Sequence, residues 1–317
     1  MNSSQDLTGF PDILAIGEPM VEFNQTGEAD ARLYLQGFGG DTSNFVIAAA
    51  RQGARVGYIT ALGDDPYGAM LRNLWNEEGV DTRDVMSNPV AFTAIYFVTH
   101  SERGHQFDFF RKGSAASLMR PSDLRADNIR RAKVLHLSGI SLAISKSVRD
   151  TCFVACDIAK SAGVKVSFDT NLRLKLWSME EARDVMRRAI ALSDICLPSY
   201  DDMTALAGLT EPEAIVQYCL DLGAKTVALK LGAQGALLGE AGVRHRISAF
   251  ACNPVDATGA GDAFGGALVA RLVAGDSLLA AGKYAAIVAA LSTEGFGAVA
   301  PIPFAQAVWD RSARAES

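Results

Sequence analysis

The sequence holds few residues that could bind a metal ion through sulfur or imidazole. Its 317 residues include five cysteines at irregular spacing and four histidines. No Cys-x-x-Cys pair occurs and the histidines do not cluster with the cysteines, so we do not expect a structural zinc site. Cys152 and Cys156 lie one helical turn apart, which favours two small core residues. This cysteine usage is typical of a reducing, cytoplasmic compartment.

Long hydrophobic runs and clusters of basic residues are also missing. The longest apolar stretch, 285–291, is far too short to span a bilayer. Residues 1–11 are polar and lack the charged start and apolar run of a signal peptide. The net charge is −6, and no run of Lys or Arg provides the basic face of a nucleic-acid binder. We therefore expect a cytoplasmic protein without a membrane or nucleic-acid partner.

Three common catalytic motifs are absent. No Gly-x-x-x-x-Gly-Lys-Ser/Thr run occurs, which excludes a Walker A loop, and no Gly-x-Ser-x-Gly elbow occurs, which counts against a hydrolase. Gly259 and Gly261 are followed by Phe264 where a dinucleotide fingerprint would have its third glycine. A dehydrogenase on a doubly wound sheet is therefore disfavoured.

Short apolar runs alternate with longer amphipathic stretches along the chain. This alternation predicts an α/β fold with a largely parallel sheet covered on both faces. We expect strands at 13–16, 56–61, 134–137, 164–168, 195–197 and 226–230. We expect helices at 42–52, 67–78, 145–162, 178–193, 200–222, 259–274, 277–293 and 304–314.

Two regions depart from this alternation. Residues 21–38 and 92–111 show strand-like alternation without intervening helices. They predict a small β insertion over the main sheet, contributed by about 18–38 and 91–112. No internal repeat, low-complexity tract or long linker divides the chain, so we expect 1–317 to form a single α/β domain carrying this insertion.

The segment from Asp256 to Phe264 carries the clearest chemical signal. Gly259 and Gly261 allow a sharp turn and a close approach of backbone to a ligand, and an apolar helix follows. Free N–H groups at a helix start bind anions such as phosphate. Asp262 lies in the first turn, where it is either an ordinary helix-start carboxylate or a base beside the anion.

This segment, Asp256-Ala-Thr-Gly-Ala-Gly-Asp-Ala-Phe264, resembles the C-terminal signature of the ribokinase-like, PfkB-type carbohydrate kinases. The N-terminal glycine motif of that family is present as Gly37-Phe-Gly-Gly-Asp-Thr-Ser-Asn44. Family-like runs follow at 63–68 and 78–81, so the resemblance covers about 12 to 303. It implies a Rossmann-like, three-layer α/β/α ribokinase-type fold with a small β-sheet lid, and ATP with Mg²⁺ as cofactors.

The resemblance also assigns roles to residues. Asp262 becomes the catalytic base, and Gly259, Ala260 and Gly261 form the anion hole. Asp202 could hold Mg²⁺ through water, although Ser199-Tyr-Asp-Asp202 departs from the Asn-x-x-Glu of the family; a first-turn helix carboxylate is the alternative. The residues expected to bind the nucleotide are Ser199, Lys230, Gly232, Gly235, Gly259 and Gly261. The 230–235 segment could equally be a plain β-hairpin.

The substrate is predicted from two further runs. Phe110-Arg-Lys-Gly-Ser-Ala resembles 2-keto-3-deoxygluconate kinases more than fructokinases, and 168–177 has a pattern that both groups share. The planar guanidinium groups of Arg111 and Arg173 could each bind a carboxylate on the sugar through two hydrogen bonds. The residues expected to bind the substrate are Gly40, Asn44, Tyr96, Phe109, Arg111, Asn171, Arg173 and Asp262. Phe109 stands where relatives often have Tyr, and Phe296 where some have Asp.

We therefore expect ATP-dependent phosphorylation of the C6 hydroxyl of 2-keto-3-deoxygluconate. The alternatives are a fructokinase or ribokinase-like kinase of a neutral sugar, and a non-catalytic sugar- or nucleotide-binding regulator. Against the regulator, Gly259-Ala-Gly-Asp262 is intact, and a protein that only binds needs no base there. The family also pairs lid strands between subunits in many members, which makes a homo-oligomer through the lid possible.

Overall fold

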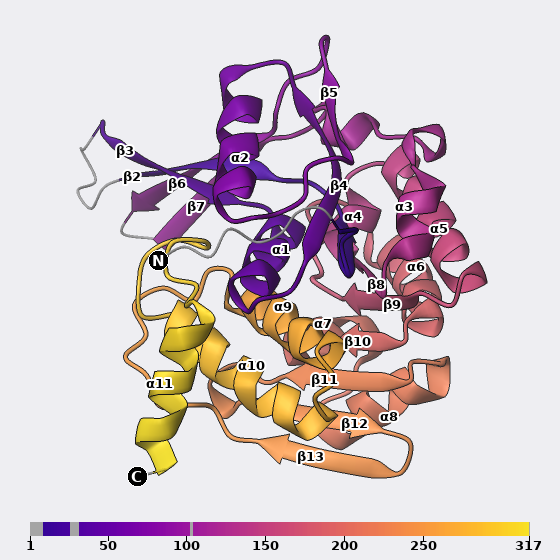
Figure 1. The fold of residues 1–317 in the computed structure, drawn as a ribbon, viewed down its shortest axis with the longest axis vertical. Coiled ribbons are helices and arrows are strands. Elements are labelled where there is room, and N and C mark those ends of the chain that lie inside the picture. The colour runs from indigo at the N-terminus through magenta and orange to yellow at the C-terminus, as the bar shows by residue number, and fades with distance from the viewer. Residues whose placement is uncertain (1–8, 26–31, 102–103, 317) are drawn as a thin grey trace.

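A nine-stranded sheet forms the centre of the computed structural model, which describes residues 9–25, 32–101 and 104–316 (Figure 1). Its strands, in spatial order, are β13 (Val243–Ile247), β12 (Ala236–Glu240), β11 (Thr226–Lys230), β10 (Ile195–Leu197), β9 (Lys165–Asp169), β8 (Val134–Ser138), β1 (Ile13–Ile16), β4 (Val56–Gly63) and β5 (Val85–Asn88). The strands from β11 to β5 pair in parallel, whereas β12 and β13 add an antiparallel edge.

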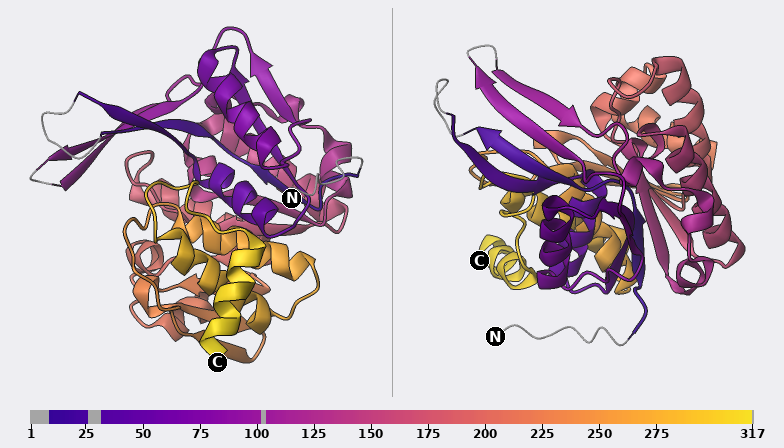
Figure 2. Two further views of the ribbon diagram at one scale, coloured as in Figure 1. Left: turned by 60° about the vertical axis from the view of Figure 1, so that its left-hand side comes forward. Right: turned by 90° about the horizontal axis from the view of Figure 1, so that it is seen from above.

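Helices cover both faces of this sheet, as the right-hand view of Figure 2 shows. One face packs against α1 (Asp41–Arg51), α9 (Ala260–Val273) and α10 (Leu278–Ser292), with α2 (Pro66–Glu77) and α11 (Ala305–Glu316) beside them. The other face carries α3 (Ala126–Arg131), α4 (Gly139–Ala143), α5 (Lys146–Ser161), α6 (Met179–Leu192), α7 (Tyr200–Ala207) and α8 (Pro212–Leu222). In β1, Ile13 belongs to the first core and Leu14 to the second, because successive side chains point to opposite faces.

A second sheet projects from this body (Figure 2). It has four strands in the described residues, in the order β3 (Tyr34–Gly39), β2 (Met20–Gln25), β6 (Ile95–Ser101) and β7 (Gly104–Phe110). Phe23 and Phe97 stack on its outer face with ring centroids 5.2 Å apart, while Glu22 and Tyr96 share the inner face. This sheet comes from the two regions expected to form a β insertion; residues 26–31 of the first lie outside the described residues.

The predicted alternation of strands and helices is confirmed, with one correction. The helix expected over 200–222 is two helices, because Gly208, at φ +71°, ends α7 and Pro212 begins α8. The elements β5, β13, α3 and α4 were not expected from the sequence, whereas β12 pairs with β11 as the hairpin alternative for 230–235 implies. Among the described residues, no helix has the length and apolar character needed to cross a membrane. The polar segment 1–11 lies mostly outside them.

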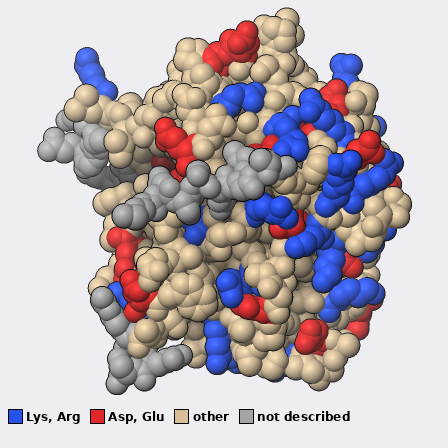
Figure 3. Space-filling view, viewed as in Figure 1, with Lys and Arg blue, Asp and Glu red and all other residues tan. Residues whose placement is uncertain are grey.

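Charge is distributed unevenly over the molecule. On the face drawn in Figure 3, Lys and Arg side chains gather where Figure 1 places α3, α5 and α6. The projecting sheet lies at the other side of that view. On this face, a group of basic residues therefore lies away from the projecting sheet.

Candidate active site

Polar residues converge where the carboxyl ends of the parallel strands meet the starts of three helices. Glu18 follows β1 and Asp169 ends β9, while Asp41 opens α1 and Asp262 lies in the first turn of α9. The carboxyl ends of parallel strands are the usual place for ligand sites in open α/β sheets. The second sheet stands over this edge, since Asp262 adds to the burial that raises the pKa of Tyr96 in β6, and Arg111 just after β7 forms an ion pair with Glu18.

The turn before α9 is shaped to receive an anion. Gly259 caps the helix with φ +76°, and a Cβ there would lie 3.0 Å from Ala298. No side chain among the described residues caps the 14-residue helix. Ala260 N donates to Ala257 O at 3.2 Å, which leaves the N–H groups of Gly259 and Gly261 for a ligand. Asp256 holds the preceding loop, because its carboxylate accepts hydrogen bonds from the N–H groups of Thr258 and Gly297, both at 2.9 Å.

Asp262 is half-buried and tied to α1. Its Oδ2 accepts a hydrogen bond of 2.9 Å from Asn44 Nδ2. Burial, followed by the charge of Asp41, raises the pKa of Asp262 to about 8, although Asn44 and Lys230 act in the opposite direction. The carboxyl group therefore exchanges a proton near neutral pH, which suits a general base.

Asp41 and Asn44 provide acceptors that no described residue satisfies. Asp41 Oδ2 accepts a hydrogen bond of 3.2 Å from Asn171 Nδ2, but Asp41 Oδ1 and Asn44 Oδ1 are buried without a partner among the described residues. Burial raises the pKa of Asp41, while Ser138 and two arginines lower it. Asn171 has a positive φ of +29°, a strained conformation that often marks a functional site. Unsatisfied buried acceptors call for a donor from a ligand.

An ion pair lies beside the anion-binding turn. Lys230, at the end of β11, places Nζ 2.5 Å from Asp169 Oδ2. The same Nζ lies 3.4 Å from the position a Cβ on Gly261 would take. Next to this pair, Thr170 Oγ1 donates a hydrogen bond of 2.7 Å to Asp202 Oδ2. Asp202 is thus held at the start of α7, close to the strand ends.

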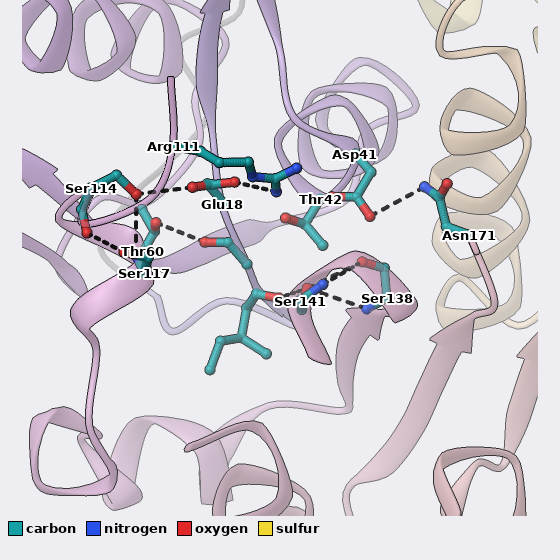
Figure 4. A network of polar contacts seen from close by, with 12 residues as sticks. Glu18, Asp41, Thr42, Thr60, Arg111, Ser114, Ser117, Ser138, Ser141 and Asn171 are labelled. Atoms are coloured by element: carbon teal, nitrogen blue, oxygen red, sulfur yellow. Dashed lines mark hydrogen bonds and ion pairs between the residues drawn. The ribbon is translucent and has the colours of Figure 1, made fainter. Parts of the chain in front are cut away.

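A buried network fixes the base of the second sheet (Figure 4). Arg111, just after β7, forms an ion pair with Glu18, and Ser114 Oγ donates a hydrogen bond of 2.9 Å to the same carboxylate. Burial raises the pKa of Glu18 although Arg111 and Ser114 lower it. Asp41, Asn171 and Ser138 lie beside this network in the same view. Arg111 therefore already has a carboxylate partner within the chain.

The inner face of the second sheet carries aromatic rings over the site. Tyr96 is buried and donates a hydrogen bond to Glu22. Phe109 stacks on Tyr96 with ring centroids 5.5 Å apart, and it remains 44% exposed. The guanidinium carbon of Arg111 lies 5.7 Å from the centroid of the Phe109 ring. A ligand beneath this sheet would meet an apolar ring and a group of carboxylates.

The remaining predicted residues have clear structural surroundings. A Cβ on Gly40, whose φ is +99°, would lie 2.4 Å from Glu18 O, so α1 can begin there only with glycine. Arg173 is exposed and donates to Leu172 O at 2.8 Å, yet its charge lowers the pKa of Asp41. Ser199 Oγ accepts a hydrogen bond of 3.2 Å from Asp202 N and so caps α7. Gly232 and Gly235 lie in the hairpin between β11 and β12, and Phe296 is exposed.

Four carboxylates of this site were not among the predicted site residues: Glu18, Glu22, Asp41 and Asp169. Asp41 lies inside the glycine motif and Asp169 inside the 168–177 pattern. The position of each within a motif could therefore have identified it as a site residue. Glu18 lies two residues after an apolar run, where the edge of a parallel sheet was to be expected. In the part of the chain that the structure describes, no group of three or more His, Cys, Asp or Glu could hold a metal ion by itself.

Comparisons with known proteins agree with this arrangement. A family model described as pfkB family carbohydrate kinase matches residues 11–305. Fructokinase-1 of Zea mays is 34% identical over 305 residues, which cover 92% of this chain and 94% of that protein. The narrower resemblance to 2-keto-3-deoxygluconate kinases finds no support, because the curated relatives found are fructokinases.

Solved structures show the same fold. A fructokinase from Vibrio cholerae O395, in a form with fructose, ADP and calcium ion bound, has a TM-score of 0.84 and 31% identity, covering 94% of this chain and 97% of its own. An Escherichia coli relative in complex with ATP and Mg²⁺ has a TM-score of 0.89 and 27% identity, covering 96% of this chain and 100% of its own. The expected ribokinase-type α/β fold is therefore confirmed.

Proposed function

The chain belongs to the pfkB family of carbohydrate kinases, and on that basis we propose that it transfers the γ-phosphoryl group of ATP to a hydroxyl group of a neutral sugar, with fructose as the first candidate. The observation that carries the proposal is the pairing of Asp262 with the open N-terminus of α9. A base and an anion cradle within one helical turn are what phosphoryl transfer to an alcohol requires.

The chemical step uses groups of this chain. Asp262 accepts the proton of the sugar hydroxyl as the oxygen forms a bond to the γ-phosphorus. The bond between the γ-phosphorus and the bridging oxygen of ADP breaks, and ADP leaves with that electron pair. The N–H groups of Gly259 and Gly261 stabilise negative charge on the transferring group, and Ala260 N would join them once it leaves Ala257 O. Asn44 orients the base through its hydrogen bond to Asp262.

ATP and Mg²⁺ suit the residues present. The uncapped start of α9 and its glycine turn leave room and donors for phosphate groups. Mg²⁺ would supply charge neutralisation of the phosphates, and Asp202 would hold it through water. Gly232 and Gly235 shape the hairpin after Lys230, where the rest of the nucleotide would lie.

The charges around the sugar pocket favour a neutral substrate over an acid. Arg111 pairs with Glu18 through one terminal nitrogen and Lys230 pairs with Asp169, so both charges are already balanced within the chain, although Arg111 Nε is buried without a partner among the described residues. Asp41 and Asp262 add further negative charge when they are ionised, and exposed Arg173 is a cation that lowers the pKa of Asp41. Asp41 Oδ1 and Asn44 Oδ1 need donors, which sugar hydroxyls supply. The fructokinase relatives point to the same class of substrate.

The second sheet would serve as a lid over the sugar. Tyr96 and Phe109 on its inner face would cover the substrate, and Gly40 would bring the start of α1 close to it. Closing such a lid expels water and limits hydrolysis of ATP. Asn171 and Arg173, beside Asp41, would border the far side of the sugar.

The test measures ADP release with ATP and Mg²⁺ against fructose and 2-keto-3-deoxygluconate in parallel. Turnover of fructose, with little of the keto acid, is the expected result. Turnover of the keto acid alone would restore the carboxylate interpretation of Arg111 and Arg173 and contradict the charge argument. If neither sugar is phosphorylated but both ATP and fructose bind, the protein is a non-catalytic binder and the proposal is wrong.

A further inference from the structure

A cavity separate from the candidate active site lies between α6, α7 and α8. Its volume is about 340 Å³, within the range of about 300–1,000 Å³ that small-molecule sites occupy. The floor is apolar and consists of four buried side chains: Met186, Ile190, Met203 and Leu206. The rim is polar, because Arg183, Arg187 and Tyr218 lie around it. An apolar floor under a few polar groups is the usual form of a ligand site.

The two arginines of this rim carry charge that the chain does not balance. Arg183 and Arg187 lie one helical turn apart on α6, and both are exposed. Arg187 makes no ion pair or hydrogen bond with a described residue, and Arg183 donates through Nε alone, to Leu206 O at 2.8 Å. In the part of the chain that the structure describes, no acidic side chain lines the cavity. Like charges one turn apart repel each other, so this pair favours an anionic ligand.

The floor of the cavity is connected to the candidate active site by two methionines. Met203 follows Asp202, whose carboxylate accepts the hydrogen bond from Thr170 Oγ1. Met186 Cε lies 2.5 Å from the place of a Cβ on Gly139, and Thr170 O lies against the same place. Methionine side chains adapt readily to a ligand, so a molecule on the floor would shift groups that pack against Thr170 and Asp202.

We propose that this cavity is a regulatory site for a small organic anion with an apolar body, such as an aryl carboxylate. Arg183 and Arg187 hold the carboxylate at the rim, and the apolar floor accepts the ring. Through Met186 and Met203, the occupied cavity changes the affinity for ATP with Mg²⁺, since Asp202 lies at the start of α7. This regulatory part rests on the proposed kinase function.

The first test measures binding of 4-phenylbutyrate by calorimetry without nucleotide. The matched neutral ligand is 4-phenylbutanol, which has the same apolar body. We expect wild type to bind the acid at least about fivefold more tightly than the alcohol, because hydrogen bonds to charged groups are the stronger ones. Arg187→Gln should lose this preference. Arg188→Gln is the control and should keep it, since the guanidinium carbon of Arg188 lies 3.8 Å from the centroid of the Phe153 ring and Arg188 does not line the cavity.

Three results of this test would overturn the proposed site. They are no saturable binding of 4-phenylbutyrate, equal affinity of wild type for the acid and the alcohol, and the same loss of preference in both variants.

The second test measures the Kd for ATP with Mg²⁺ at zero and at saturating 4-phenylbutyrate. We expect a change of about fivefold or more in wild type and R188Q, and none in R187Q. By linkage, saturating ATP should change the affinity for 4-phenylbutyrate by the same factor. An unchanged Kd for ATP would show that the regulatory part is wrong. If wild type does not bind ATP, the kinase proposal fails, whereas the first test still decides whether the cavity binds an anion.

Discussion

Asp262 shows how one residue depends on its immediate neighbours. Its pKa is raised to about 8 by burial and by Asp41, so at pH 6 most of the population holds a proton and cannot act as a base. The ratio kcat/KM reports the ionisation of the free enzyme. We therefore expect kcat/KM for the sugar to rise with pH and to reach half its maximum near pH 8. The measurement is a pH profile of ADP release at low sugar concentration.

Asp41→Asn tests the cause of that pKa. Loss of the Asp41 charge lowers the pKa of Asp262, so the midpoint of the profile should move to lower pH. The absolute rate should also fall, because Asp41 borders the sugar, but the midpoint is independent of that loss. A midpoint that stays in place, or moves to higher pH, would show that Asp41 does not act on the base.

Asp262→Asn tests the base itself. The amide has nearly the same shape as the carboxylate but cannot accept the proton of the hydroxyl. We expect kcat to fall by about 10²–10⁴-fold, with nucleotide affinity close to that of wild type. Stopped assays of sugar phosphate with thermal unfolding as a folding control would measure this. Turnover within a few-fold of wild type would remove Asp262 from the mechanism.

At the scale of elements, the start of α9 depends on one glycine. Gly259 has φ +76°, and a Cβ there would lie 3.0 Å from Ala298. Gly208, at the end of α7, has φ +71°, and nothing lies within 4 Å of its Cβ position. Both Ala variants should lose about 1–2 kcal/mol through backbone strain. Gly259→Ala should lose more, because Ala298 must move.

The same pair of variants separates strain from function. Urea unfolding measures the two free energies, and ADP release measures activity. Gly259→Ala should lower kcat because it displaces the N–H groups of the anion cradle, whereas Gly208→Ala should keep wild-type kcat. Equal effects of the two substitutions on both stability and activity would argue against a special role for the turn before α9.

Elements with a strong local signal could be predicted from the sequence. The apolar run Ile13–Ile16 has the bounds of β1, and the glycine at 53 follows the end of α1. By contrast, the polar run Arg244-His-Arg within Val243–Ile247 has no strand-like apolar pattern, and this edge strand owes its conformation to pairing with β12. The apolar pattern across 200–222 predicts one continuous helix. In the structure, Gly208 ends a first helix and Pro212 begins a second.

The site was predictable only where one motif contains it. Asp262 and its glycines were recognised from a single run of sequence. The contacts that tune them join distant residues: Asn44 and Asp262 are 218 positions apart, and Asp169 and Lys230 are 61 apart. Patterns along the chain do not show such pairs, so the sequence predicts a substrate carboxylate as the partner of Arg111, whereas the structure pairs Arg111 with Glu18.

At the scale of the whole molecule, the projecting sheet leaves apolar surface uncovered. On its inner face, beyond Tyr96, Leu35 is 62% exposed and Phe107 is 39% exposed. Both β3 and β7 are edge strands, whose unpaired backbone groups favour association with another chain. Exposed apolar patches of this kind often mark contacts between proteins. We therefore propose that a second copy of the chain covers this face.

Two phenylalanines of β7 test whether the chain associates through this inner face. Phe107 lies on the inner face, opposite Val98, while Phe110 is 55% exposed on the outer face, opposite Ile95. Sedimentation velocity should show a dimer for wild type and for Phe110→Asp, and a monomer for Phe107→Asp, because a charge on the inner face cannot be buried between two lids. A monomeric wild type, or dissociation of both variants alike, would mean that the inner face does not join two chains.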